Sequence, residues 1–136
     1  MPQDSLSVVQ DVYSAFGRGD IPALLAALTP DVHWELVGRA GEYPTFGVRS
    51  GPEGVVGFFT ALAEVEDISE FVPERLHAAG DTICVEGRVA LTLKNNGRRL
   101  AYDWLHVFNV RDGKVASFRE FYDTAAVVEA YRGRRA

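Results

Sequence analysis

Two segments with alternating side chains flank Asp112-Gly113, and this pattern predicts a long β-hairpin over residues 98–122. An Asp-Gly pair between alternating runs is a strong signal for a tight hairpin turn, because both central residues of that turn adopt positive φ angles. Side chains along a strand point alternately to opposite faces. The turn and the alternation together therefore predict which residues of the two arms share a face.

His106 and Glu120 are predicted to share one face of this hairpin. The aromatic residues of the same face come from both arms: Tyr102, Trp104, Phe108, Phe118 and Tyr122. A titratable pair among aromatic rings is typical of a small-molecule pocket, where burial shifts pKa values into a range that is useful for catalysis. His106 and Glu120 are therefore candidate catalytic residues, and the aromatic residues are candidate ligand contacts.

The rest of the chain predicts helices first and strands afterwards. Expected helices cover residues 5–16, 21–28, 52–63 and 124–132, and expected strands cover residues 31–37, 68–78, 82–94, 98–111 and 114–122. The helices follow from apolar residues at helical spacing and from their capping residues, and the strands from alternation. This order predicts an α+β fold in which a curved antiparallel sheet wraps around three N-terminal helices.

Composition indicates one globular domain over residues 1–136, with 47% apolar residues and a net charge of −5. A concentrated basic face for nucleic acid or an anionic membrane is not expected at this charge. Cys84 is the sole cysteine, and the first nine residues carry neither a basic cluster nor a long apolar run, so we expect a cytoplasmic protein. His33, His77 and His106 lack close metal-ligand spacing, so we expect no metal site and no cofactor.

The sequence predicts a homodimer. Every second residue along much of the strand 82–94 is apolar, and the apolar face that these residues form extends onto the hairpin. A sheet face that is exposed to water should be polar, so an apolar outer face requires a partner, most simply a second copy. The predicted interface comprises Val85, Val89, Leu91, Leu105, Val107 and Phe121.

The irregular segment 38–51 is rich in glycine and carries Tyr43 and Phe46. Long loops in compact domains are usually functional lids or disordered segments. We therefore expect this segment to cover the mouth of the cavity and its two aromatic residues to contact the ligand.

The order of elements and several short motifs resemble the SnoaL-like branch of the nuclear transport factor 2-like superfamily over nearly the whole chain. The motifs are Gly19-Asp20-Ile21, Asp31-Val32-His33-Trp34, Gly51-Pro52-Glu53-Gly54, Arg111-Asp112-Gly113-Lys114-Val115 and Arg119-Glu120-Phe121-Tyr122-Asp123. The resemblance implies a cone-shaped (cystatin-like) α+β barrel with a cavity between the helices and the concave sheet, usually as a homodimer. It implies much less about the reaction, because this fold hosts several chemistries and also non-catalytic binding domains.

Two enzyme classes of the superfamily match the chain only in part. Ketosteroid isomerases carry a base aspartate on the first strand and a tyrosine on the first helix, and these positions correspond here to Leu36 and, one place out of register, Tyr13. Limonene epoxide hydrolases carry an arginine on the third strand and an acid on the last, which would be Arg88 and Glu120. Their second acid corresponds to Ala90, so an epoxide hydrolase-like reaction is an alternative that lacks one carboxylate.

The resemblance to SnoaL-type polyketide cyclases is closer, because these enzymes carry a histidine and an acid at the positions of His106 and Glu120. It implies a cofactor-independent enzyme that removes a proton next to a carbonyl of an apolar cyclic metabolite, with Glu120 as base. His106 would polarise the carbonyl or hold the carboxylate, and Arg88 would stabilise an enolate or neutralise Glu120. The alternative is a binding or accessory domain in which these three residues form a satisfied buried cluster without turnover.

The same resemblance extends the set of candidate ligand contacts to Tyr13, Trp34 and Phe59, which lie on elements that border the expected cavity. Flat aromatic surfaces would suit a polycyclic or aromatic ligand, although aromatic residues at such spacing also build ordinary cores. Asp123 follows Glu120 on the same segment and is interpreted as the cap of the last helix. Which of these two acids faces the cavity stays open at the level of sequence.

Overall fold

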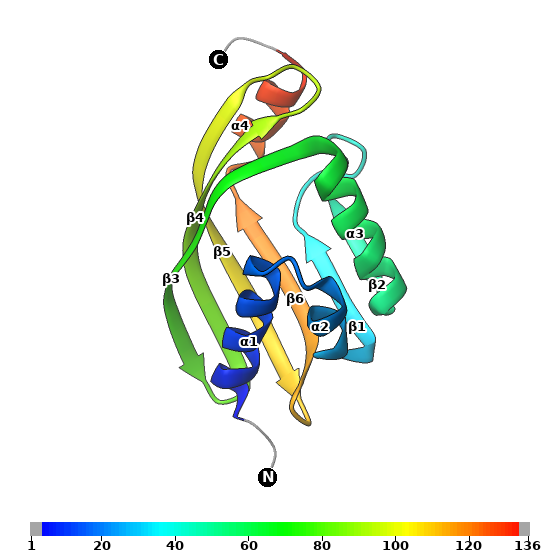
Figure 1. Ribbon diagram of the computed structural model, residues 1–136, viewed down its shortest axis with the longest axis vertical. Coiled ribbons are helices and arrows are strands. Elements are labelled where there is room, and N and C mark those ends of the chain that lie inside the picture. The colour runs from blue at the N-terminus through cyan, green and yellow to red at the C-terminus, as the bar shows by residue number, and fades with distance from the viewer. Residues whose placement is uncertain (1–3, 134–136) are drawn as a thin grey trace.

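A computed structural model describes residues 4–133 of the chain, which form helices packed against a six-stranded sheet (Figure 1). The elements are α1 (Ser5–Gly17), α2 (Ile21–Ala26), β1 (Leu28–Leu36), β2 (Gly47–Ser50), α3 (Gly51–Val65), β3 (Glu66–Ala79), β4 (Thr82–Leu93), β5 (Arg99–Arg111), β6 (Lys114–Tyr122) and α4 (Thr124–Tyr131). Every predicted element forms, with ends that differ from the predicted ones by at most a few residues. The short strand β2 lies inside the segment that was expected to be irregular.

Aspartate residues set the start of three helices. Asp4, Asp20 and Asp123 each precede a helix and accept a hydrogen bond from the backbone N–H three residues later. Such caps satisfy amide groups that have no partner within the helix. The interpretation of Asp123 as a helix cap is therefore confirmed, and its carboxylate is not among the groups that line the pocket described below.

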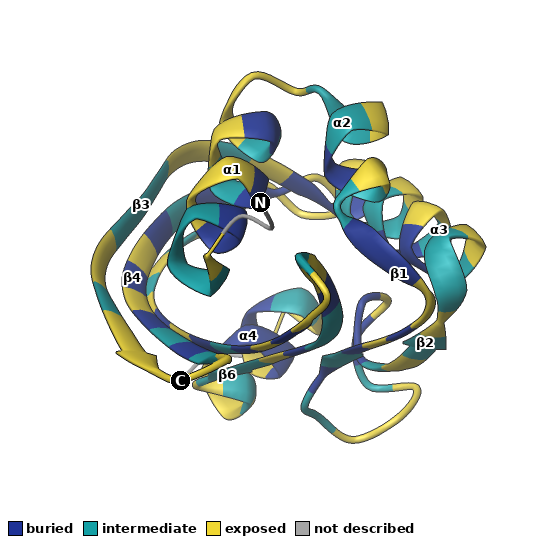
Figure 2. Cartoon of the chain, turned by 90° about the horizontal axis from the view of Figure 1, so that it is seen from below, coloured by how far each residue is buried: buried dark blue, intermediate teal, exposed yellow. Residues whose placement is uncertain are grey.

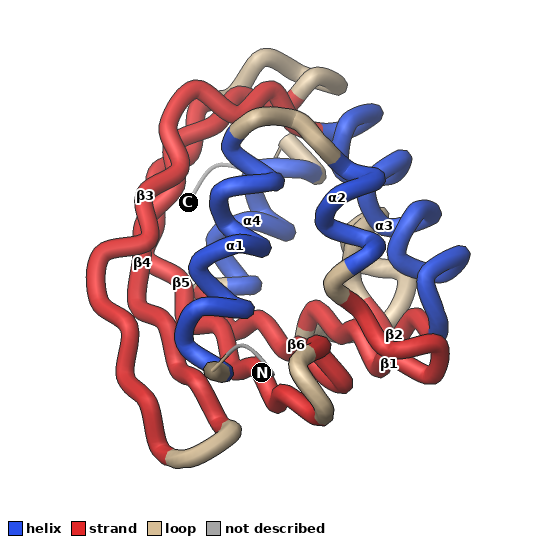
Figure 3. The backbone as a smooth tube through the Cα atoms, turned by 60° about the horizontal axis from the view of Figure 1, so that its bottom comes forward, coloured by secondary structure: helices blue, strands red, loops and turns tan. Residues whose placement is uncertain are grey.

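The sheet has the strand order β2-β1-β6-β5-β4-β3 and stays open, with β2 and β3 at its edges. Neighbouring strands are antiparallel except for β1 and β6, which run parallel. The sheet curves strongly around α1, while α3 packs against β1 (Figure 3). This arrangement confirms the predicted α+β fold. None of the helices in the described part of the chain is long and apolar enough to cross a membrane.

The Asp112-Gly113 turn forms as predicted and fixes the register of the hairpin. Asp112 and Gly113 have φ angles of 51° and 77°, the positive values that a tight hairpin turn requires. In the resulting register His106 lies directly opposite Glu120. The prediction that these two residues share a face is confirmed.

The face of β4 that was expected to point outward points inward. Val85 pairs with His106 in the sheet, and Val85, Val89 and Leu91 are 0%, 6% and 2% exposed. Their side chains belong to the core between the sheet and the helices, where the buried residues gather (Figure 2). The predicted dimer interface is therefore wrong for these three residues. On the outer face only Leu105, Val107 and Phe121 of the predicted set remain, and Leu105 is 37% exposed.

Candidate functional site

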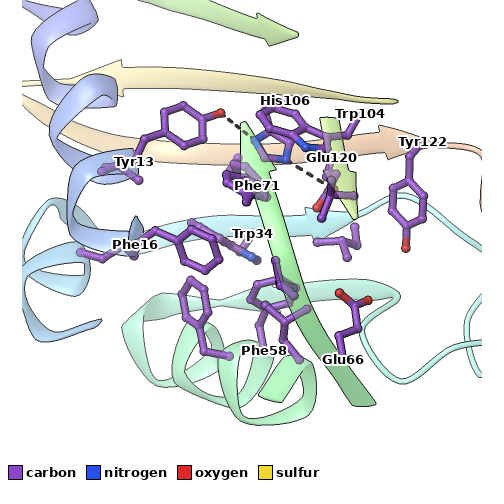
Figure 4. Close-up of a pocket in the computed structure, with 18 of the residues that line it drawn as sticks. Tyr13, Phe16, Trp34, Phe58, Glu66, Phe71, Trp104, His106, Glu120 and Tyr122 are labelled. Carbon is purple, nitrogen blue, oxygen red and sulfur yellow. Dashed lines mark hydrogen bonds and ion pairs between the residues drawn. The ribbon is translucent and has the colours of Figure 1, made fainter. Parts of the chain in front are cut away.

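A pocket lies between the concave face of the sheet and the helices α1 and α3 (Figure 4). It contains about 660 Å³ of space between atoms, part of which is open to solvent. It is lined by Val12, Tyr13, Phe16, Leu24, Trp34, Leu36, Phe58, Phe59, Leu62, Glu66, Ile68, Phe71, Val89, Tyr102, Trp104, His106, Phe108, Phe118, Glu120 and Tyr122.

Half of the lining residues were predicted from the sequence. The predicted ligand contacts that line the pocket are Tyr13, Trp34, Phe59, Tyr102, Trp104, Phe108, Phe118 and Tyr122. Of the three predicted catalytic residues, His106 and Glu120 are in the lining and Arg88 is not. The lining is therefore a largely aromatic wall with a small number of titratable groups, as expected for a site that binds an apolar ligand.

His106 connects Tyr13 of α1 with Glu120 of β6. The Tyr13 hydroxyl oxygen lies 2.7 Å from His106 Nδ1, and His106 Nε2 lies 3.4 Å from Glu120 Oε2 (Figure 4). The second contact is within ion-pair distance but does not have the geometry of a hydrogen bond. Burial and the negative charge of Glu120 hold the pKa of the Tyr13 hydroxyl well above its usual range, so Tyr13 keeps its proton.

This arrangement favours one tautomer of the imidazole. An ionised carboxylate can only accept hydrogen bonds, and a neutral tyrosine hydroxyl can donate one. The tautomer with its proton on Nε2 of His106 would place an N–H beside Glu120, without a hydrogen bond at 3.4 Å, and would leave Nδ1 to accept the hydrogen bond from Tyr13. The group is buried, because the side chains of His106 and Glu120 are only 5% and 13% exposed.

Stacked rings hold the titratable groups in place. Trp104 lies parallel to His106 with ring centroids 3.9 Å apart, and Phe71 stacks on the Trp104 ring at 4.9 Å. Trp34 stacks on Phe118 at 4.1 Å across the β1–β6 pairing. Aromatic rings in such layers restrict one another's rotation, so the imidazole has little freedom to turn away from its partners.

The pocket wall also contains two indole N–H groups without partners. Trp34 Nε1 and Trp104 Nε1 are buried and have no hydrogen-bond partner among the described residues. Burying a donor without an acceptor costs about 1–3 kcal/mol. The Trp34 nitrogen points into the pocket (Figure 4), where an oxygen atom of a ligand would satisfy it.

Glu66 is a pocket residue that the sequence analysis missed. It is the first residue of β3, directly after α3, and it is 8% exposed. The Tyr43 hydroxyl donates a hydrogen bond of 2.6 Å to its Oε2. Burial raises the pKa of Glu66 to about 7, and the charge of Glu120 acts in the same direction, while the Tyr43 hydrogen bond acts against it. In the sequence, a glutamate at the end of an amphipathic helix is typical of an exposed position, so no local signal marked it.

Arg88 lies on the outer face of β4, away from the pocket. Its side chain is 51% exposed and forms ion pairs with Glu70 and, at 3.8 Å, with Glu74 of the neighbouring strand β3. The prediction of Arg88 as a catalytic residue is therefore wrong. The arginine that the epoxide hydrolase alternative requires does not reach the cavity, so that alternative loses its second catalytic element.

Tyr43 and Phe46 do not line the pocket, which corrects their prediction as direct ligand contacts. Both are buried, at 2% and 8% exposure, in the segment between β1 and β2. Phe46 packs near Tyr122, and Tyr43 packs edge-on against Tyr131 of α4. The segment thus supports the wall of the pocket from behind, and Tyr43 acts on the pocket through Glu66.

The comparisons with known proteins agree with this fold. The family model that describes the SnoaL-like domain matches residues 9–118. The chain belongs to the SnoaL-like family. None of the curated proteins matches it at a significant level.

Solved structures resemble this SnoaL-like chain over nearly its full length. A nuclear transport factor 2-like protein from Burkholderia thailandensis E264 is 30% identical, with a TM-score of 0.86, over 94% of this chain and 97% of that one. A similar protein from Burkholderia xenovorans LB400 is 30% identical, with a TM-score of 0.85, over 96% and 98%. TerC, crystallised with polyporic acid, is 25% identical, with a TM-score of 0.84, over 94% and 98%.

Proposed function

We propose that this SnoaL-like protein is a small cofactor-independent enzyme that removes a proton next to a carbonyl of an apolar cyclic metabolite. The observation that carries the proposal is the Glu120 carboxylate beside His106 in a largely aromatic pocket. A carboxylate in such surroundings is poorly hydrated and available as a base. The aromatic walls suit a flat ligand, and the TerC structure with polyporic acid supports an aromatic ligand class for this fold.

In the proposed step Glu120 accepts the proton from the carbon next to the carbonyl. His106 holds the carboxylate in position and is itself held by Tyr13. The negative charge that develops on the carbonyl oxygen needs hydrogen-bond donors, and the unpartnered indole N–H of Trp34 is one that the pocket offers. Returning the proton to another carbon gives an isomer, and attack of the enolate carbon on a second carbonyl of the same molecule gives a ring.

The experiment compares the parent protein with Glu120→Gln on steroid-like and polyketide-like ketones, by following the exchange of hydrogen next to the carbonyl for deuterium in D₂O. The substitution keeps the volume and removes the proton acceptor, so we expect the rate to fall about 10²-fold with little change in ligand affinity. Glu86→Gln, on the exposed face of β4, is the matched control and should keep the parent rate. Equal rates in the parent and Glu120→Gln would remove Glu120 from the mechanism.

The second candidate is a non-catalytic small-molecule-binding or accessory domain. It is favoured by the internal pairing of the polar groups, since Tyr13 binds His106 and Tyr43 binds Glu66. In that case the substitutions at His106 and Glu120 would change affinity or stability, and none of the ketones would exchange hydrogen in the parent. Titration of the protein with polyporic acid, followed by tryptophan fluorescence, measures binding independently of turnover.

We also propose a homodimer that uses the outer face of β5 and β6. Leu105 is 37% exposed there, and Val107 and Phe121 lie on the same face. Sedimentation at micromolar concentration should give a dimer that Leu105→Glu dissociates, because a buried unpaired charge is strongly unfavourable. A monomeric parent would refute this proposal.

A further inference from the structure

Glu66 enters the pocket from the junction of α3 and β3, whereas Glu120 enters it from β6. Both carboxylates line the same pocket, and Figure 4 shows the Glu66 carboxylate pointing toward the space that Glu120 and Tyr122 border. The mechanism proposed above uses Glu120 and leaves Glu66 without a role. A second buried carboxylate is costly for the fold unless it is neutral or paired with a cation.

One oxygen of Glu66 is occupied and the other is free. Oε2 accepts the 2.6 Å hydrogen bond from Tyr43, whose ring is buried between Phe46 and Tyr131. Among the described residues, none donates a hydrogen bond to Oε1. The segment between β1 and β2 therefore fixes the orientation of the carboxyl group and leaves Oε1 for a ligand.

Burial and the negative charge of Glu120 on β6 favour the neutral form of Glu66, whereas the hydrogen bond from Tyr43 favours the ionised form. The hydroxyls of Tyr102 on β5 and Tyr122 on β6 also lie near Glu66, whose charge raises the pKa of both. In the described part of the chain, none of the groups that act on Glu66 is a cation. Burial and the like charge of Glu120 therefore outweigh the Tyr43 hydrogen bond, and the pKa of Glu66 rises to about 7.

We propose that Glu66 is a neutral carboxylic acid that donates its proton to the carbonyl oxygen of the ligand, opposite the base Glu120. This role rests on the proposed function, and it adds the acid that the base alone lacks. It also specifies the ligand class, because the ligand must present a carbonyl oxygen on the Glu66 side and an acidic C–H on the Glu120 side. In many acid–base catalysts, the surroundings of two carboxyl groups keep one group protonated and the other ionised.

The proton balance of this step closes without a further reactant. Glu120 takes the proton from carbon, the C–H electron pair forms the C=C bond, and the carbonyl π pair moves to oxygen, which takes the proton of Glu66. In the return step the enol oxygen gives its proton back to Glu66, while Glu120 delivers its proton to carbon. In D₂O the proton on Glu120 exchanges first, so each cycle places deuterium on carbon and restores both carboxyl groups.

The test uses 1-tetralone, an apolar bicyclic ketone, with the parent and the variants Glu66→Gln and Glu66→Leu. The amide of glutamine can still donate a hydrogen bond, whereas leucine cannot. We expect Glu66→Leu to lose about 10²-fold in deuterium exchange. At pH 6 the rate of Glu66→Gln should lie within about tenfold of the parent rate. Above pH 7 the parent rate should fall, because Glu66 loses its proton, whereas the rate of Glu66→Gln should stay the same. Glu64→Gln, exposed two residues away, is the control and should behave as the parent.

A second measurement on the intact protein does not depend on turnover. The ¹³C signal of one glutamate carboxyl should titrate near pH 7 and be missing in Glu66→Gln. A protein in which every carboxyl titrates below pH 5.5, or one in which Glu66→Leu exchanges hydrogen as fast as the parent, overturns the proposal for Glu66. If the parent exchanges nothing, the proposed function fails, and the carboxyl titration alone then decides whether Glu66 is the neutral acid.

Discussion

The Tyr13 hydroxyl lies 2.7 Å from Nδ1 of His106, although 93 residues separate them in the chain. Through this contact α1 fixes a ring of β5 inside the concave face of the sheet. Because the other nitrogen of the ring faces Glu120, the orientation of the candidate base depends on a helix at the opposite end of the sequence. The site is therefore assembled by tertiary packing and not within the hairpin alone.

Tyr13→Phe should destabilise the protein by about 1–3 kcal/mol, because it leaves a buried ring nitrogen of His106 without its partner. Urea denaturation measures this change. Tyr102→Phe is the matched control, since Tyr102 lines the same pocket and its hydroxyl has no hydrogen-bond partner among the described residues. Equal losses in the two variants would mean that the Tyr13–His106 contact contributes nothing to stability.

The hairpin and its candidate catalytic pair could be predicted because the relevant signals are local. An Asp-Gly turn and strict alternation determine the register, and the register places His106 opposite Glu120. The same alternation predicts that the rings of Trp104 and Phe108 lie on the face that carries His106. No long-range information was needed for this part of the site.

The face of β4 could not be predicted in the same way. Its register with β5 depends on residues 94–98, where Asn95-Asn96-Gly97 allows several loop geometries, and a shift of one residue exchanges the two faces. Val85 and Val89 were expected outside and Arg88 in the cavity, and the structure has the opposite. Glu66 was missed for another reason, since only the packing of a loop that lies distant in sequence buries it.

Arg88→Ala tests the corrected position of this side chain. An exposed ion pair contributes about 0–1 kcal/mol, so the variant should lose no more than this in the free energy of unfolding. Its rate of deuterium exchange should equal that of the parent, whereas His106→Ala should lower the rate. A loss of rate in Arg88→Ala as large as that in His106→Ala would contradict the outward placement.

The stability of the protein should depend on pH through Glu66. Its pKa is about 7 in the folded protein and about 4.5 in the unfolded chain, so the folded state binds more protons between these values. The stabilisation that belongs to the neutral form is fully present below pH 4.5 and is lost as the pH rises through 7. Relative to Glu66→Gln, the parent should therefore lose up to about 3 kcal/mol between pH 4.5 and pH 8.

The measurement is urea denaturation of both proteins at several pH values, with the difference taken at each value. The difference cancels the contributions of the other carboxylates, which are common to both proteins. A difference that does not change across this range would mean that Glu66 is ionised in the folded protein at pH 5 as it is in the unfolded chain.

Gly87→Ala should disturb the aromatic wall directly. A Cβ atom at this position would collide with the Trp104 ring and would lie 2.6 Å from the carbonyl oxygen of Val72. Trp104 stacks on both His106 and Phe71, and these contacts restrict its movement. We expect a loss of about 1–3 kcal/mol in urea denaturation, the usual cost of overpacking, together with a change in tryptophan fluorescence.

Gly17→Ala separates this packing effect from the general effect of replacing glycine by alanine. Gly17 ends α1, and a Cβ atom there would meet no atom within 4 Å. The backbone at Gly87 does not have a positive φ angle, so alanine can adopt its conformation and only the collision remains as a cause. If Gly87→Ala is as stable as Gly17→Ala, the Trp104 ring has room to shift, and the stack that holds His106 is looser than its distances indicate.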